Sequence, residues 1–425
     1  MDLIAYAIPF FLLALLAEIA WDRLRGSGYL RLNDAVASLS AGALSTTSGL
    51  FTKAIEIAIY ALLLKHVAPY PLDPALFDLS WRGVGLFLVV LLAWDFLYYW
   101  NHRLGHTVNV LWAAHVVHHQ SEEYNLSTAL RQTSTGFVFG WIFYVPLLLV
   151  GVPAHVVATA AAVDLIYQFW VHTRHVGSLG WFDRVFVSPS NHRVHHAQNE
   201  RYLDRNYGGI LIIWDRLFGT FQPELADEPC VYGVRKPLES WSPLRANIQT
   251  YRDVFALSRR SRRWGDRIGV WFRRPNWRPA DLGGSISLDD GALEGFTRFD
   301  TKAPPRVSRY VLMQFIVAAV LTGAISLNAA VLPTSALVLL CLGLWSLLAT
   351  ICGLLESPAR GLQAEQSRLV IVNPLLAAVA ALLFSDIAIF LAAAVLVYGG
   401  ISWLLLRLAA SAARDGRSAL VEGHG

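Results

Sequence analysis

The sequence contains few cysteines and few charged residues for its length. Only three of its 425 residues are cysteine, and Cys230, Cys341 and Cys352 have neither zinc-binding spacing nor the pattern of a disulfide framework. Thiolate chemistry is therefore not expected. Charged residues make up 16% of the chain and hydrophobic residues 55%, and the mean hydropathy is +0.44. This composition is typical of a membrane protein rather than of a soluble domain.

The sequence also lacks the features of a cleaved signal peptide, of a zinc metalloprotease and of a nucleic-acid-binding module. The first apolar stretch, residues 3–21, lacks a basic amino-terminal region and a small-residue cleavage site. Since it is long enough to cross a bilayer, we interpret it as an anchor rather than a cleaved signal peptide. No HExxH motif occurs, which removes the general base of a zinc metalloprotease. No nucleic-acid-binding module is visible, and the formal net charge of +4 is modest.

Long apolar segments recur along the chain and are interrupted once by a polar stretch. They predict an all-α integral membrane protein, a multi-span helical bundle of about eight to ten spans. One of them, 35–64, is too long for a simple span and contains Lys53 and Glu56. The apolar segments are 3–21, 35–64, 84–100, 136–152, 154–170, 308–331, 333–353, 368–385 and 387–407.

The charges of the loops favour one orientation in the membrane. Arg23, Arg25 and Arg31 lie between the first two apolar segments, whereas the loop 65–83 carries Asp73 and Asp78. The positive-inside rule then places the amino terminus outside and the polar regions 101–135 and 171–307 in the cytoplasm. Arginine outnumbers lysine, which hints at a GC-rich bacterial genome. We expect a bacterial inner membrane, or the endoplasmic reticulum membrane if the source is eukaryotic.

Five regions can be distinguished along the chain. Within the third of them, arginines interleave with Trp264, Trp271 and Trp277, as expected of a segment that lies on anionic headgroups. The regions are the amino-terminal transmembrane helices (1–100), a histidine-rich catalytic region with two spans (101–222), a cytoplasmic basic and aromatic membrane-surface segment with a linker (223–305), a carboxyl-terminal four-helix transmembrane region (306–410) and a cytoplasmic tail (411–425).

Histidines are concentrated in one part of this apolar chain. The motif HxxHH occurs twice, at 115–119 and 192–196, and HxxxH occurs at 102–106. Residues i, i+3 and i+4 share one face of a helix, so each motif directs several imidazoles to one place. Buried histidines are costly in a membrane protein unless they are functional. The motifs predict a cytoplasmic metal site with ligands His102, His106, His115, His118, His119, His192, His195 and His196, and with His172 as a ninth.

The number of imidazoles exceeds the need of one ion. A zinc site takes four ligands, whereas eight or nine histidines suit two ions with open positions. Two irons are attractive because a redox pair can use O₂, but spacing alone leaves copper or two zincs open. A haem-binding electron carrier is a further alternative, and so is a metal transporter, although a transporter's ligands would be spread across the membrane depth.

The motifs resemble those of the fatty acid hydroxylase/sterol desaturase superfamily of membrane di-iron oxygenases. The stretches LWAAHVVHHQSEEYNLSTALRQ (111–132), YQFWVH (167–172), SNHRVHH (190–196) and NYGGILIIWDRLFGTF (206–221) are most similar to its alkylglycerol monooxygenase branch. The resemblance implies an oxidoreductase with two iron ions bound by the nine histidines. It also implies O₂ as cosubstrate and, in the animal enzymes, tetrahydrobiopterin as electron donor.

The same resemblance implies a lipid monooxygenase that cleaves the O-alkyl ether bond of alkylglycerols through a hemiacetal to a fatty aldehyde. The alternative is a sterol, carotenoid or fatty acyl hydroxylase or desaturase. Partners would be the lipid, the membrane and a pterin or a redox protein.

One position departs from the family pattern. The animal enzymes carry Glu after the second histidine of the first motif, and Thr107 stands there in this chain. Either another acid, such as Glu122 or Glu123, takes over its role, or the pterin or substrate step differs. Polar groups are also expected to hold the ligating rings, and Asp95 stands out because it is a carboxylate inside an apolar segment.

Overall fold

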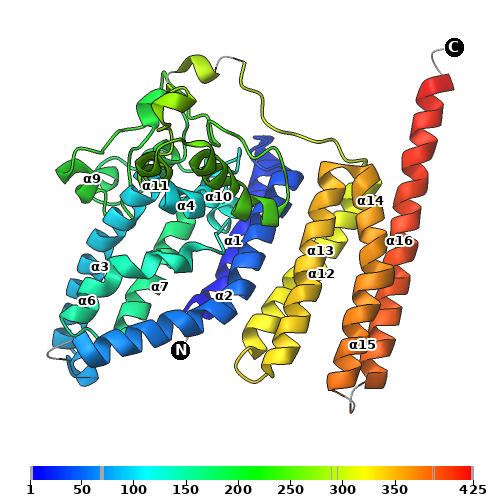
Figure 1. Ribbon diagram of the computed structural model, residues 1–425, viewed down its shortest axis with the longest axis horizontal. Helices are drawn as coiled ribbons and strands as arrows, with labels where there is room; N and C mark the ends of the chain where they lie inside the picture. The colour runs from blue at the N-terminus through cyan, green and yellow to red at the C-terminus, as the bar shows by residue number, and fades with distance from the viewer. Residues whose placement is uncertain are drawn as a thin grey trace. The chain divides into compact units, whose positions relative to one another are not determined.

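The computed structural model describes residues 3–67, 71–288, 290–293, 295–384, 386 and 388–422 (Figure 1). Within these ranges the chain is helical or irregular, and its β structure consists of three isolated bridges. The predicted all-α class is confirmed. The chain divides into two compact units, and α2 (Leu32–Val67) and α10 (Pro243–Arg260) contribute residues to both.

The first unit comprises Met1–Arg31, Phe51–Leu238 and Asn247–Arg298. Its longest helix that lies wholly inside the unit is α3, which packs against α4 and α7, while α1 packs against α7. The helices of this unit, besides its shares of α2 and α10, are α1 (Leu3–Arg25), α3 (Trp81–Thr107), α4 (Asn109–His119), α5 (Leu126–Ala129), α6 (Val145–Leu149), α7 (Ala154–Trp170), α8 (Pro189–His195), α9 (Ile213–Leu217) and α11 (Trp264–Phe272).

An apolar core joins α3, α6 and α7. Trp94 of α3 stacks on Tyr144 with ring centroids 3.7 Å apart. Val90, Leu148 and Ala160 are buried in the same cluster. On the other side of α7, Phe169 stacks on Phe11 of α1 at 4.1 Å. These contacts fix the ends of α3 and α7, from which His102 and His172 are presented.

The apolar segment 136–152 differs from the continuous helix that its length suggests. It forms two 3₁₀ segments, η2 (Gly136–Val138) and η3 (Gly140–Tyr144), followed by α6. Glycine favours irregular backbone, and Pro146 lacks the amide hydrogen that a continuing helix needs. The segment therefore folds back against α3 in short pieces instead of forming one long rod.

Helix α8 begins at a serine cap. The Ser188 side chain accepts a hydrogen bond from the Asn191 amide, and Pro189 occupies the first turn. A serine cap followed by proline is a favourable helix start because it satisfies an amide that has no intrahelical partner. The cap fixes where the first turn of α8 begins, and so it determines which way the histidines of the second HxxHH motif point.

The second unit comprises Leu32–Leu50, Glu239–Ala246 and Phe299–Gly425. Glu365 and Arg368 form a buried ion pair in it, with Arg368 Nε 2.8 Å from Glu365 Oε2. Tyr310 and Thr350 also donate to the Glu365 carboxylate, so this pair ties three helices together. The helices that lie wholly in this unit are α12 (Pro305–Asn328), α13 (Thr334–Glu356), α14 (Pro358–Ser367), α15 (Asn373–Leu383), joined to α14 by a π-helical turn over Arg368–Val372, and α16 (Ala388–Glu422).

Five described helical stretches are long and apolar enough to cross a membrane. They are Trp81–Thr107, Pro305–Asn328, Thr334–Glu356, Pro358–Leu383 and Ala392–Ala410. Helix α7, at 17 residues, is slightly shorter than a typical span. The protein is therefore a helical, multi-pass membrane protein.

Candidate metal centre

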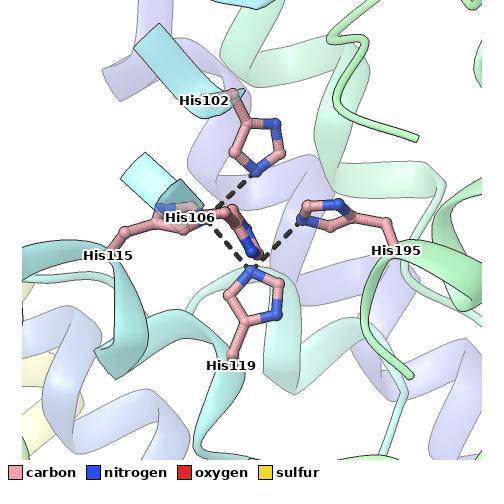
Figure 2. Close-up of side chains that lie close together, drawn as sticks. All are labelled: His102, His106, His115, His119 and His195. Atoms are coloured by element: carbon pink, nitrogen blue, oxygen red, sulfur yellow. Dashed lines mark hydrogen bonds between the residues drawn. The ribbon is translucent and has the colours of Figure 1, made fainter. Parts of the chain in front are cut away.

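Five histidines form a first group, shown in Figure 2. Helix α3 presents His102 and His106, helix α4 presents His115 and His119, and α8 presents His195. Each residue offers one ring nitrogen, and all five lie within 4.8 Å of one another. The Nε2 atom of His115 is 3.0 Å from the Nε2 atoms of both His102 and His119. We refer to these residues as group one.

Four histidines form a second group of the same kind, here called group two. His118 comes from α4, His172 directly follows the last turn of α7, and His192 and His196 come from α8 and its end. The Nε2 atom of His172 is 3.1 Å from that of His118 and 3.2 Å from those of His192 and His196. Together the two groups contain all nine histidines predicted as ligands.

Each HxxHH motif supplies both groups. In the first motif, His115 and His119 belong to group one and His118 to group two. The second motif is reversed, because His192 and His196 belong to group two and His195 to group one. Successive helical residues are about 100° apart, so adjacent histidines diverge while i and i+4 stay on one side. The doubled motif therefore builds two centres that share helices α4 and α8.

The hydrogen bonds of two rings in group two indicate which ring nitrogen carries the proton. The Nδ1 atoms of His118 and His172 lie 3.0 and 2.8 Å from the carbonyl oxygens of Arg131 and Gln168. A carbonyl can only accept, so both Nδ1 atoms carry the ring proton and both Nε2 atoms are bare acceptors. Two lone pairs that face each other at 3.1 Å repel, unless a cation lies between them.

The spacing of the nitrogens agrees with a cation. Two nitrogens that are each roughly 2.0–2.1 Å from one ion lie roughly 2.9–3.4 Å apart, depending on geometry. The closest Nε2 pairs in both groups are 3.0–3.2 Å apart. In addition, the Nε2 atom of His106 is buried without a hydrogen-bond partner. Both groups therefore fit a metal ion.

Burial keeps the rings neutral, which is the ligating form. It lowers the pKa of His118 to about 4, and it lowers the pKa of His119, His172 and His195 well below the ordinary value. The neighbouring imidazoles add to this effect because like charges disfavour protonation. Near neutral pH the groups consequently present lone pairs rather than positive charges.

A loop after α8 orients two rings of group one. His195 Nδ1 donates to the Arg205 carbonyl at 3.0 Å, and His102 Nδ1 donates to the Tyr207 carbonyl at 2.8 Å. Asp204 and Asn206 alternate with these residues and have φ values of 58° and 54°. Asp and Asn adopt this left-handed conformation more readily than most residues, so the loop can turn both carbonyls inward.

Two buried carboxylates hold that loop in place. Asp215 accepts the amides of Tyr207 and Gly208 at 2.7 and 2.8 Å. Asp95 of α3 accepts a hydrogen bond from the backbone amide of Ile210 at 2.7 Å. It also accepts hydrogen bonds from the backbone amide of Leu211 and from the indole N–H of Trp214. Asp95 is therefore in contact with the loop that orients His102 and His195, and it does not belong to either histidine group.

Gly209 lies between these anchors. A Cβ atom there would lie 2.6 Å from Asp164 Oδ1 and 3.0 Å from Asp95 Oδ1. The glycines of the Asn206-Tyr-Gly-Gly turn thus allow the backbone to pack against two carboxylates.

A carboxylate of the amino-terminal helix binds two segments next to group two. Glu18 of α1 accepts the Leu126 amide at 2.7 Å through one oxygen and the Thr173 hydroxyl at 2.6 Å through the other. Thr173 follows His172 directly, and Leu126 begins the short helix that leads to the Arg131 carbonyl. Glu18 was not among the predicted site residues, although a carboxylate inside an apolar helix is a signal for such a role.

The other acids singled out in the sequence lie elsewhere. Glu123 is buried in ion pairs with Arg31 (2.5 Å) and Arg298 (2.8 Å). Glu122 is buried with its side chain against Gly233. Neither belongs to the two histidine groups. The Thr107 hydroxyl donates to the Arg103 carbonyl of its own helix at 3.0 Å.

A cavity of about 530 Å³ reaches the centre. His106, His119 and His195 of group one and His196 of group two line its wall. Apolar side chains such as Trp112, Val254 and Leu257 line it as well. Such a volume suits part of a lipid-sized molecule.

The comparisons with known proteins agree with this site. The profile of the fatty acid hydroxylase family matches residues 87–220, which span all nine histidines. Human alkylglycerol monooxygenase is 36% identical over 317 residues, covering 74% of this chain and 69% of that protein. The enzyme of the same name from Danio rerio is 32% identical over 368 residues, covering 86% and 80%. An ornithine lipid hydroxylase from Rhizobium tropici is 30% identical over 135 residues, covering 30% and 39%. No solved structure matches.

The fold, the histidine groups and these matches define a membrane-bound lipid oxygenase, an oxidoreductase of the monooxygenase type. The chain belongs to the alkylglycerol monooxygenase family. The resemblance seen in the sequence is confirmed.

Proposed function

We propose that the nine histidines bind two iron ions, one in each group. The observation that carries this proposal is the contact between two unprotonated Nε2 atoms of His118 and His172, 3.1 Å apart, in a group of which His172, His192 and His196 are buried. Iron is favoured over zinc because five imidazoles in group one exceed the usual four ligands of zinc. Bound iron would supply the O₂-dependent oxidant that cleavage of an unactivated C–H bond requires.

We propose that the reaction is cleavage of the O-alkyl ether bond of an alkylglycerol. One oxygen atom of O₂ would become a hydroxyl on the ether-bearing carbon, and the other would leave as water with two electrons and two protons from a reductant. The resulting hemiacetal would break its C–O bond, giving a fatty aldehyde and the glycerol alcohol. The names of the relatives support this substrate, since they are called alkylglycerol monooxygenases.

The residues of the cavity would orient the lipid and exclude water. Trp112, Val254 and Leu257 offer apolar contact for the alkyl chain beside His106 and His119. Holding the ether-bearing carbon in one place next to the centre would decide which C–H bond reacts. The carbonyls of Arg205 and Tyr207 would keep two rings in the ligating tautomer throughout turnover.

The reductant would be tetrahydrobiopterin or a redox protein. Thr107 stands where the animal enzymes carry an acid, so a pterin could not contact a carboxylate at that position in this chain. The arginine-rich loops support a cytoplasmic location of the centre, where both kinds of reductant occur.

An aerobic assay with a labelled alkylglycerol tests the proposed reaction. Labelled fatty aldehyde is expected from purified protein with a reductant present, and His118→Ala should abolish it. His175→Ala is the matched control, because His175 lies near α1 and outside both groups. A hydroxylated product with its ether bond intact would instead assign the chain to the acyl- or sterol-hydroxylating members of the superfamily.

A further inference from the structure

Helix α10 has one buried face and one exposed face on which apolar side chains and arginines lie together. Val254 is buried on one face, whereas Ile248 and Phe255 are 51% and 54% exposed on a second. Arg252 and Arg259 are exposed on the same side of the helix as Ile248 and Phe255, and Arg259 lies over the Phe255 ring. An amphipathic helix with one face on the protein and an apolar strip next to arginines is suited to the boundary between protein, lipid and water.

Helix α11 carries a second exposed apolar strip. Trp264, Ile268 and Phe272 are spaced four residues apart, so they form one line, and they are 74%, 60% and 64% exposed. On the other side of α11, Val270 is buried, and its carbonyl accepts a hydrogen bond from the Asn109 side chain of α4 at 2.9 Å. The exposed line is thus held firmly, at the helix that carries His115, His118 and His119.

The charge around this strip is strongly positive. Residues 259–278 contain eight arginines and one acidic residue, Asp266. Several arginines lie over aromatic rings of the same segment: Arg267 is 4.6 Å from the centre of the Trp264 ring, and Arg273 is 4.8 Å from that of Trp277. Paired cations and aromatics of this kind match a layer of anionic headgroups above acyl chains.

Helix α10 also forms part of the cavity wall. Thr250, Val254 and Leu257 of α10 line the cavity that His106 and His119 reach from the other side. Arg260 and Arg278 lie at this cavity too, and both are exposed. The segment 243–278 therefore combines exposed apolar side chains, a cationic border and a wall of the cavity next to the histidines.

We propose that the exposed strip of α10 and α11 docks on the bilayer surface and that its arginines recognise anionic lipid headgroups. Ile268, Trp264 and Phe272 then lie among the upper acyl chains, while the arginines lie at the phosphates. Docking holds the cavity at headgroup level, so an amphiphile can pass from the membrane to the centre. Only this last consequence depends on the proposed function, and the docking itself does not.

Spin labels at two positions of α11 test the docking. Ile268→Cys and the matched control Asp266→Cys, on opposite sides of the helix, are labelled in the full-length protein with Cys230→Ser. The variants are placed in nanodiscs of phosphatidylcholine with phosphatidylglycerol. The label at 268 is expected to collide at least about threefold more with O₂ than with a water-soluble nickel complex, relative to the label at 266.

Two results would overturn the proposal. Equal access of the nickel complex at 268 and 266 would show that the strip stays in water. Loss of access to both reagents at 268 would show that protein, such as another part of this chain or a second copy, covers the strip instead.

A second comparison tests the recognition of anionic lipid. The double substitution Arg262→Gln/Arg263→Gln should reduce the O₂ preference at 268 in the anionic nanodiscs at least twofold. Arg201→Gln, which removes an exposed charge outside this segment, should leave the preference unchanged. An unchanged preference in the double variant, or equal depth in nanodiscs of phosphatidylcholine alone, would rule out a role for the arginines.

Discussion

The two histidine groups share helices α4 and α8 but differ in their access to the cavity. Group one contributes His106, His119 and His195 to the cavity wall, whereas group two contributes only His196. Group one has five members and group two has four. The difference indicates that a lipid in the cavity meets group one first and that group two lies behind it.

The groups also differ in how the protein holds them. Group one depends on a loop whose carbonyls are fixed by Asp95 and Asp215. Group two depends on Glu18, which reaches from α1 to two segments more than 100 residues away. The two groups can therefore be perturbed separately, because their supporting residues are different.

The largest effect is expected from removing a ligand. His118→Ala should remove the ion of group two and His119→Ala that of group one, although these residues are neighbours in the chain. Iron content should fall from about two to about one per chain in each variant, and ether cleavage should fall by at least about 10³-fold. Metal analysis and product formation measure both. Variants that kept full iron would show that these rings are not ligands.

A smaller effect is expected when the loop behind group one is loosened. Asp215→Asn leaves one acceptor oxygen for the amides of Tyr207 and Gly208 and for the Thr220 hydroxyl. The carbonyls that orient His102 and His195 should shift, lowering iron affinity about 10- to 100-fold at one of the two sites. Chelator titration followed by metal analysis measures the affinities. Asp253→Asn, at an exposed ion pair, is the control and should have no effect.

A similar or smaller effect is expected at group two from a change in α1. Glu18→Gln keeps one acceptor but cannot accept from both Leu126 and Thr173. Iron should leave group two about tenfold more readily, while group one retains its ion. Asp22→Asn, one helical turn further along α1, is the matched control. Equal loss of both ions would contradict the separate support of the two groups.

The smallest effect is expected from pH on the iron-free protein. The folded-state pKa of His118 is about 4, below the ordinary value of 6.5, so the unfolded chain binds protons more readily between these values. Stability is therefore present above pH 6.5 and is lost as the pH falls towards 4. Thermal unfolding of chelator-treated protein should show a falling midpoint over this range. An unchanged midpoint would mean that the rings are accessible to water.

Much of the site could be predicted from the sequence, because helical spacing is local information. The two HxxHH motifs and the HxxxH motif identified the residues that the structure brings together. The partition into two groups could not be predicted. Whether His118 and His119 face the same ion depends on how α4 is turned toward α3 and α8, which is a tertiary property.

The supporting residues were harder to predict for a related reason. Asp95 was singled out in the sequence because a carboxylate in an apolar segment is unusual, and in the structure it holds the loop behind group one. Glu18 satisfies the same rule but is 108 residues from Leu126, and no local pattern connects them. Glu122 and Glu123 were offered as substitutes for the acid that is missing at Thr107, and the structure places Glu123 in ion pairs with Arg31 and Arg298.

Mössbauer spectroscopy of iron-57-loaded protein, combined with iron quantification, tests the central claim most directly. Two histidine groups of different size should hold about two irons per chain, seen as two distinct ferrous signals of equal area. One signal at about one iron per chain, or a haem absorption band, would contradict the account.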